Sequence, residues 1–173
     1  MRTSRLHSFI APCVAALVSL AAALPALAGP REDLRAAEQS IRGGDVVTAI
    51  VALRKLSEEN YAPAQARLAD LQFSAENYEE ALELYRKAAQ QGDGHGQWGL
   101  GRMHAEGAKV PRDPAQALQL YRQAAEKNAW QGFDALARAY RSGDLGLTKD
   151  LTEAEAMDKR AQAAREAAEK DLK

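Results

Sequence analysis

Two histidines, His95 and His104, are the most evident candidates for metal ligands in this sequence. They lie nine residues apart, and their nearest acidic neighbours are Asp93 and Glu106. A metal site needs several ligands that converge on one point, and these four residues do not form a complete ligand set. We therefore expect no metal ion and no other cofactor, and we interpret His104 as a packed structural side chain.

Residues for covalent or acid–base catalysis are equally sparse. The Gly-rich run over residues 92–96 follows a predicted helix rather than a strand, so it indicates a helix end and a turn, not a phosphate-binding loop. Carboxylate pairs such as Glu79-Glu80 are interpreted as solvated helix surface. The serines beyond the N-terminal segment fall at predicted helix ends or surfaces, outside any nucleophile turn: Ser40, Ser57, Ser74 and Ser142. We expect no catalytic residues and no enzyme activity.

Residues 1–28 have the pattern of a secretory signal peptide. Arg2 and Arg5 give a basic start, residues 9–24 form an almost wholly apolar run, and Ala26-Leu27-Ala28 matches a small-x-small cleavage site. The alternative is an uncleaved membrane anchor, which the shortness of the run and its flanking prolines disfavour. We expect cleavage before Gly29, a periplasmic location and no stable membrane insertion after cleavage; secretion beyond the periplasm stays open.

The composition of the chain favours packed helices. It is 46% hydrophobic but only 6% aromatic, which suits helices that pack through small side chains better than a sheet. The single cysteine, Cys13, falls inside the signal segment, so residues 29–173 must be held together by packing alone. That part has 21 basic and 24 acidic residues, a net charge of −3. No excess of positive charge points to nucleic acid.

Internal repeats organise the rest of the chain. With an offset of 32 residues, Ala49, Leu53 and Leu56 correspond to Ala81, Tyr85 and Ala88. With an offset of 36, Ala81, Tyr85, Ala88 and Ala89 correspond to Ala117, Tyr121, Ala124 and Ala125, and Leu100, His104 and Gly107 to Leu136, Tyr140 and Gly143. These positions have helical spacing, so the sequence predicts four repeat units over residues 31–61, 62–93, 94–129 and 130–173.

Each unit is predicted to be a pair of antiparallel helices. The predicted helices are Arg31–Arg42, Val46–Glu59, Ala62–Ser74, Tyr78–Gln91, His95–Glu106, Pro114–Lys127, Gln131–Ser142 and Glu153–Lys170. Asp45 and Asp113 are predicted to be N-caps. The pairs Asn77/Glu80 and Thr152/Glu155 have the spacing of capping boxes. A single pair cannot bury its apolar face, so stability should come from stacking of the units.

Units three and four resemble the Sel-one-like repeat (SLR) family, which is related to the tetratricopeptide repeat. The family pattern is Ala-x-x-x-Leu-Gly-x-x-Tyr, then Gly-x-Gly-Val-x-x-Asp, then Ala-x-x-Trp-x-x-x-Ala-Ala-x-x-Gly. Unit three matches it at Gly96, Leu100, Gly101, His104, Gly107, Val110, Asp113, Ala117, Leu120, Ala124, Ala125 and Asn128. Unit four matches it at Leu136, Ala137, Tyr140, Gly143, Gly146, Leu147, Asp150, Ala154, Met157 and Ala161, with one extra loop residue near Leu145. The departures are Leu120 and Met157 at the Trp position and Lys109 at the second loop Gly. Units one and two look closer to ordinary tetratricopeptide repeats.

The resemblance implies an all-α fold, a right-handed superhelix (alpha-solenoid) of about four helix pairs, that acts as a scaffold for protein–protein contacts in the bacterial cell envelope. Two alternatives remain. One is a module that binds an envelope polymer, peptidoglycan or polysaccharide, by stacking sugars on Trp98 and Trp130. The other is a hydrolase of the repeat-protein type, which the absence of cysteine after residue 28 disfavours, because hydrolytic activity is attributed to a cysteine-rich branch.

The same architecture predicts a binding surface. The first helix of each unit should line the inside of the curve, where the equivalent positions are Glu38, Asp70, Arg102 and Arg138. With their neighbours they give a predicted binding set of Arg67, Asp70, Trp98, Arg102, Arg138 and Arg141. Arginine pairs with carboxylates in a bidentate manner and stacks on aromatic rings, so an acidic or C-terminal peptide segment is the expected ligand. The alternative is that these arginines are solubilising charges paired with Glu106 and Asp134.

Overall fold

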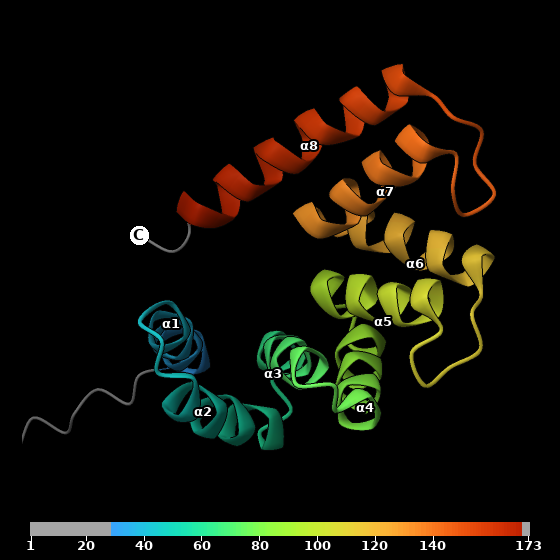
Figure 1. Cartoon of the computed structure of the whole chain (residues 1–173). Coiled ribbons are helices and arrows are strands. Elements are labelled where there is room, and N and C mark those ends of the chain that lie inside the picture. The colour runs from blue at the N-terminus through green and yellow to red at the C-terminus, as the bar shows by residue number, and fades with distance from the viewer. Residues whose placement is uncertain (1–28, 171–173) are drawn as a thin grey trace, which may run out of the picture.

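The protein is a curved stack of helices (Figure 1). The structure is a computed structural model that describes residues 29–170, which contain helices and connecting loops but no strands. The helices are α1 (Pro30–Arg42), α2 (Val46–Glu58), α3 (Ala62–Ser74), α4 (Tyr78–Gln90), α5 (Gly94–Glu106), α6 (Pro114–Glu126), α7 (Trp130–Ser142) and α8 (Leu151–Lys170). The predicted helices agree with these bounds to within two residues. The predicted signal peptide, residues 1–28, lies outside the described residues.

The helices form an alpha-solenoid. Each helix packs mainly against the next one in the chain, and α5 also contacts α3 and α7. Helices α1, α3, α5 and α7 lie on the inside of the curve, while α2, α4 and α6 lie on the outside (Figure 1). The predicted all-α fold of stacked helix pairs is therefore confirmed. No helix within residues 29–170 is long and apolar enough to cross a membrane.

The last helix differs from the others in length. Helix α8 has 20 residues, whereas α1 to α7 each have 13. Its C-terminal part extends beyond α7 toward α1, across the open side of the curve (Figure 1). The two ends of the solenoid therefore face each other across the inner surface.

Aspartates begin several of the helices. As predicted, the side chains of Asp45 and Asp113 accept hydrogen bonds from the backbone N–H groups three residues later, at 3.1 Å and 2.9 Å. The two predicted capping boxes are wrong. Asn77 donates to the Gln72 side chain at 3.0 Å, and its own side chain does not cap α4 among the described residues. Helix α8 is capped by Asp150, which lies two residues before Thr152 and accepts from two backbone N–H groups.

The long loops after α5 and α7 are equivalent. Each begins with a glycine in the left-handed region, Gly107 (φ 74°) and Gly143 (φ 79°). Each is also closed by a backbone bond of 2.9 Å to the preceding helix, from Asp113 N to His104 O and from Asp150 N to Tyr140 O. Lys109, which occupies a family glycine position, adopts the left-handed conformation too (φ 58°). The loop therefore keeps its backbone path without the second glycine.

Small residues set the distance between successive units. A Cβ on Gly96 would lie 2.5 Å from the Ala88 Cβ, and a Cβ on Gly132 would lie 2.8 Å from the Ala124 Cβ. Both alanines are fully buried. Because the two contacts are offset by 36 residues, the same close packing occurs at the α4–α5 junction and again at the α6–α7 junction. These contacts fix α5 closely against α4 and α7 closely against α6.

Candidate binding surface on the inner helices

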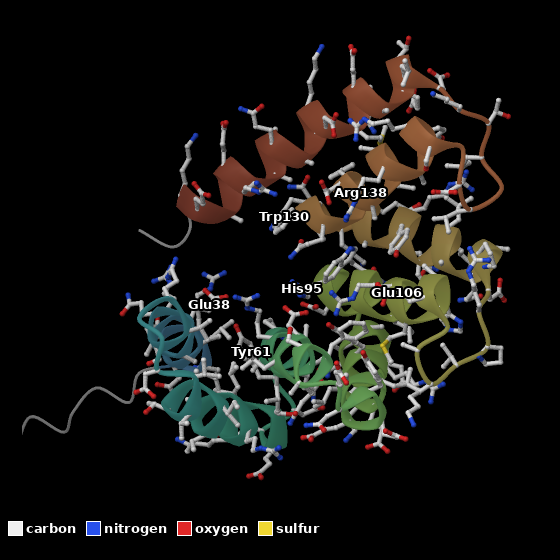
Figure 2. The ribbon with its side chains drawn as sticks, in the orientation of Figure 1. Glu38, Tyr61, His95, Glu106, Trp130 and Arg138 are labelled. Atoms are coloured by element: carbon white, nitrogen blue, oxygen red, sulfur yellow. The ribbon has the colours of Figure 1, made fainter. Side chains whose placement is uncertain are left out.

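A chain of polar contacts runs along the inner face and joins all four inner helices. Arg67 of α3 pairs with Glu38 of α1 at 3.3 Å and with Asp70 at 3.1 Å. His95 Nε2 of α5 lies 2.8 Å from Asp70 Oδ2, and His95 Nδ1 lies 2.6 Å from Gln131 Nε2 of α7. Figure 2 shows Glu38 and His95 on the inner side of the curve. We call these five residues the polar chain.

Asp70 is the centre of the polar chain. Its carboxylate accepts from the Tyr85 hydroxyl at 2.7 Å in addition to its contacts with Arg67 and His95. Burial raises the pKa of Asp70, but His95, Tyr85 and Arg67 together lower it more, so the pKa lies below its usual value of 3.8. Asp70 is therefore ionised at neutral pH. A His95 ring with its proton on Nε2 donates to Asp70 and accepts from Gln131, which satisfies both nitrogens.

Arg102 is fixed next to this chain by aromatic contacts. Its guanidinium carbon lies 3.5 Å from the centre of the Phe73 ring and 5.0 Å from that of Trp98. Its Nη2 donates to the Tyr85 hydroxyl at 3.3 Å. Burial and the Asp70 carboxylate raise the pKa of Tyr85, so this hydroxyl is neutral and can accept from Arg102 while it donates to Asp70. The Arg102 Nε is buried and has no hydrogen-bond partner among the described residues.

Arg102 borders a pocket of about 290 Å³ between α5 and α7, which we call the arginine pocket. It contains three arginines and two carboxylates beside an apolar wall. The lining residues are Trp98, Arg102, Ala105, Glu106, Arg112, Tyr121, Ala135, Arg138, Ala139, Asp144 and Leu145. Burial raises the pKa of Tyr121 to about 12, against the opposing effect of Arg138. Its hydroxyl is thus a neutral hydrogen-bond donor at physiological pH.

A second pocket, of about 260 Å³, lies at the other end of α5 and α7. We call it the central pocket because residues from α1, α3, α5, α7 and α8 line it: Glu38, Ile41, Arg42, Arg67, His95, Trp130, Gln131 and Ala168. The Trp130 ring lies against Arg165 of α8, whose guanidinium carbon is 4.1 Å from the ring centre. The C-terminal turns of α8 therefore form one wall of this pocket.

The structure places the predicted binding residues in three groups. Trp98, Arg102 and Arg138 meet at the arginine pocket, whereas Arg67 and Asp70 belong to the polar chain. Arg141 is not brought together with them, because its Nη2 lies 2.5 Å from Asp158 Oδ2 on α8.

The sequence also suggested Asp134 and Glu106 as charge partners of these arginines. Arg138 does pair with Asp134, at 2.7 Å. Glu106 lies at the pocket beside Arg102 and Arg138.

Sequence reasoning missed several residues of this surface. His95 was considered only as a metal ligand, and no cluster of three or more metal-ligating side chains occurs among residues 29–170. Gln131 occupies the same repeat position as His95, 36 residues later, and this offset is the signal that could have paired them. Arg112 lies in a loop and Tyr121 on an outer helix, so the inner-helix pattern did not include them.

Comparisons with known proteins agree with the repeat architecture. A family model for the Sel1 repeat matches residues 62–93, 94–128 and 135–157, which together are more than half of the chain. The match includes residues 62–93, where the sequence looked closer to an ordinary tetratricopeptide repeat. No curated protein sequence matches the chain.

Solved structures share the fold. A Sel1 repeat protein from Oxalobacter formigenes is 27% identical with a TM-score of 0.65, and the alignment covers 78% of this chain and 56% of that protein. A protective antigen present in uropathogenic Escherichia coli strains, which displays an SLR fold, is 28% identical with a TM-score of 0.60, covering 79% of this chain and 31% of the antigen. The chain thus spans about half of the first protein and about a third of the second. It belongs to the Sel1 repeat family, whose fold is typically a scaffold for protein interactions and is generally non-catalytic.

Proposed function

We propose that this protein is a non-catalytic interaction scaffold of the bacterial cell envelope that holds an acidic segment of a protein partner on its inner face. The observation that carries the proposal is the arginine pocket. Arg102, Arg112 and Arg138 line it beside Trp98, although the chain as a whole has a net charge of −1. A local excess of positive charge in a hollow attracts carboxylates and guides them to their site.

Arg102 and Arg138 can each bind a carboxylate at little cost. Arg102 is held between Phe73, Trp98 and Tyr85, so little conformational entropy remains to be lost when it binds a ligand. Arg138 is 64% exposed, and its pair with Asp134 is of the i,i+4 type, which contributes only about 0.3–0.5 kcal/mol. A carboxylate of a partner can therefore replace Asp134 at low cost.

The size of the pocket is compatible with side chains of a protein partner. It holds about 290 Å³, which is at the lower end of the roughly 300–1,000 Å³ that small-molecule sites enclose. It has room for one or two side chains of a larger partner. A protein partner is also what the repeat fold typically binds.

The alternative of a polymer-binding module receives less support from the geometry. Sugar stacking requires an open face of an aromatic ring. Trp98 has the His95 ring edge-on at 5.3 Å and Arg102 at 5.0 Å, and Trp130 has Arg165 at 4.1 Å. Both indoles already have partners, so a sugar would have to displace them.

The envelope location rests on the pattern of residues 1–28. The proposal predicts that a periplasmic fraction contains a protein whose intact mass begins at Gly29. A mass that includes residues 1–28, or a membrane association that resists high salt, would contradict this part of the proposal.

Binding is tested with a defined probe. A fluorescein-labelled peptide of about ten residues, rich in Glu and Asp, is titrated with the protein by fluorescence polarisation, beside the same peptide with Gln and Asn in place of the acids. We expect the acidic peptide to bind at least tenfold more tightly, and about 0.5 M salt to weaken its binding. Equal affinity of the two peptides would refute the proposal.

Paired charge reversals locate the site. Arg102→Glu with Arg138→Glu should abolish binding of the acidic peptide, whereas Arg122→Glu with Arg160→Glu, an equal change of charge at exposed positions outside the arginine pocket, should leave it nearly unchanged. Because Arg102 packs on Phe73, Arg138→Glu alone is included as a variant whose fold should remain intact. If both double variants bind equally well, the partner binds elsewhere.

A further inference from the structure

We propose that the inner groove recognises a partner segment with an acidic residue and an aromatic residue about three positions apart, the acid in the arginine pocket and the aromatic ring in the central pocket. This inference rests on the proposed function and names the class of partner sequence. It uses the central pocket, to which the proposed function assigns no role.

The spacing follows from equivalent positions on α5 and α7. His95 and Gln131 face each other at the central pocket, 2.6 Å apart. Arg102 and Arg138, each seven residues further along the same helix, line the arginine pocket. Seven residues are two helical turns, or about 10 Å. A peptide in the polyproline II conformation advances about 3.1 Å per residue with three residues per turn, so side chains three positions apart lie on one face, about 9 Å from each other.

The two pockets adjoin. Trp98 lines the arginine pocket and His95 lines the central pocket, and their rings touch edge to face with centres 5.3 Å apart. Figure 2 shows His95 and Trp130 at one end of the inner face and Arg138 between α5 and α7. A single segment in this conformation along α5 and α7 therefore passes from one pocket directly into the other.

The lining of the central pocket suits an aromatic ring. Ile41, Trp130 and Ala168 provide apolar surface, while Arg67, His95 and Gln131 provide flat polar groups. Those polar groups already bond to one another or to Asp70 and Glu38, so a polar guest would gain few new hydrogen bonds. An aromatic ring can pack on this apolar surface and stack on the Arg67 guanidinium without them. The volume of about 260 Å³ is that of a hollow for one large side chain.

A set of synthetic peptides tests the spacing. The parent peptide carries Glu and Phe three positions apart in a Gly-Ser background. One relative has the same composition with Glu and Phe adjacent, a second has Ser for Phe, and a third has Gln for Glu. All are made with Glu first and with Phe first, because the direction of the bound chain is open. Fluorescence polarisation should show the parent, in one direction, binding about tenfold more tightly than each relative.

Protein variants assign each half of the peptide to its pocket. Ala168→Leu fills the central pocket from an exposed position near the end of α8. It should lower the affinity of the parent peptide to that of the Ser relative and leave the Ser relative unchanged. Ala167→Leu, an equal addition at an exposed position outside the pocket lining, is the matched control and should have no effect. Arg138→Glu should remove the difference between the parent and the Gln relative.

The outcomes separate this inference from the proposed function. If the adjacent-residue peptide binds as well as the parent, or if exchange of Phe for Ser has no effect, the paired motif is wrong. Should acidic peptides still bind through Arg138 in that case, the proposed function stands alone. If neither the parent nor any other acidic peptide binds, both the paired motif and the proposed function are wrong.

Discussion

The Asp70→Asn substitution tests the polar chain, because the carboxylate of Asp70 joins three partners. Tyr85, His95 and Arg67 contact it at 2.7, 2.8 and 3.1 Å, and its side chain is only 22% exposed. Asparagine keeps an acceptor for Tyr85 but loses the charge that faces His95 and Arg67. Hydrogen bonds to charged groups contribute about 1.5–3 kcal/mol each, and contacts that share one residue are not additive. We therefore expect a loss of roughly 2–4 kcal/mol in the free energy of unfolding.

Urea denaturation at neutral pH measures this loss. Asp158→Asn, which breaks the Arg141 pair between side chains that are 49% and 45% exposed, is the matched control and should cost less than about 1 kcal/mol. Both substitutions remove one negative charge, so the difference between their losses in the free energy of unfolding reports the burial of Asp70. Equal stabilities of the two variants would refute the central role of Asp70.

The pH dependence gives a second readout of the same substitution. The pKa of Asp70 is lower in the folded protein than its usual value of 3.8. Its contribution to stability is therefore complete above that value and is lost as the pH falls through the lower folded pKa. The difference between wild type and Asp70→Asn should shrink from about pH 5 to about pH 2. A constant difference over this range would show that Asp70 is not stabilised in its ionised form.

Three further substitutions and one truncation test the packing and the turns. Gly99→Ala places a Cβ 2.1 Å from the ring of the fully buried Tyr85, and we expect thermal melts to show a loss of at least about 1–3 kcal/mol; an unchanged melt would contradict the close approach. Glu76→Gly relieves a left-handed residue (φ 63°) after α3 and should raise the stability to urea by about 1 kcal/mol, whereas Gly92→Ala at the equivalent turn after α4 should lower it. Truncation before Trp130 removes the unit that covers α5 and α6, so the shorter chain should aggregate or melt well below the full chain. An equal melting temperature would mean that the last unit is not part of the cooperative stack.

The helices could be predicted from sequence because the signals that define them are local. Apolar periodicity, an aspartate before a helix and a repeat offset of 32 or 36 residues all fall within one or two units. The errors at the helix starts are local too. Thr152 and Asp150 can both cap a helix, and the backbone conformation decides between them.

The binding surface could be predicted only in part, because it depends on which inner side chains converge. The repeat positions gave Arg102 and Arg138, which do meet at one pocket. Arg141 failed to join them because the last helix supplies Asp158 as a nearer partner. The connection from Asp70 to His95 crosses two units and 25 residues. The spacing of residues within one helix does not relate residues on two different helices, so this contact could be identified only from the folded structure.

The central claim, that an acidic partner segment binds in the arginine pocket, is tested most directly by the two tryptophans of the chain. Trp98 lines the arginine pocket and Trp130 lines the central pocket, so their indole N–H signals in a ¹⁵N-labelled sample report on the two pockets separately. Titration with the acidic peptide should shift the Trp98 signal to saturation, at the affinity measured by fluorescence polarisation. Binding at that affinity with an unmoved Trp98 signal, and shifts confined to the outer helices, would contradict the claim.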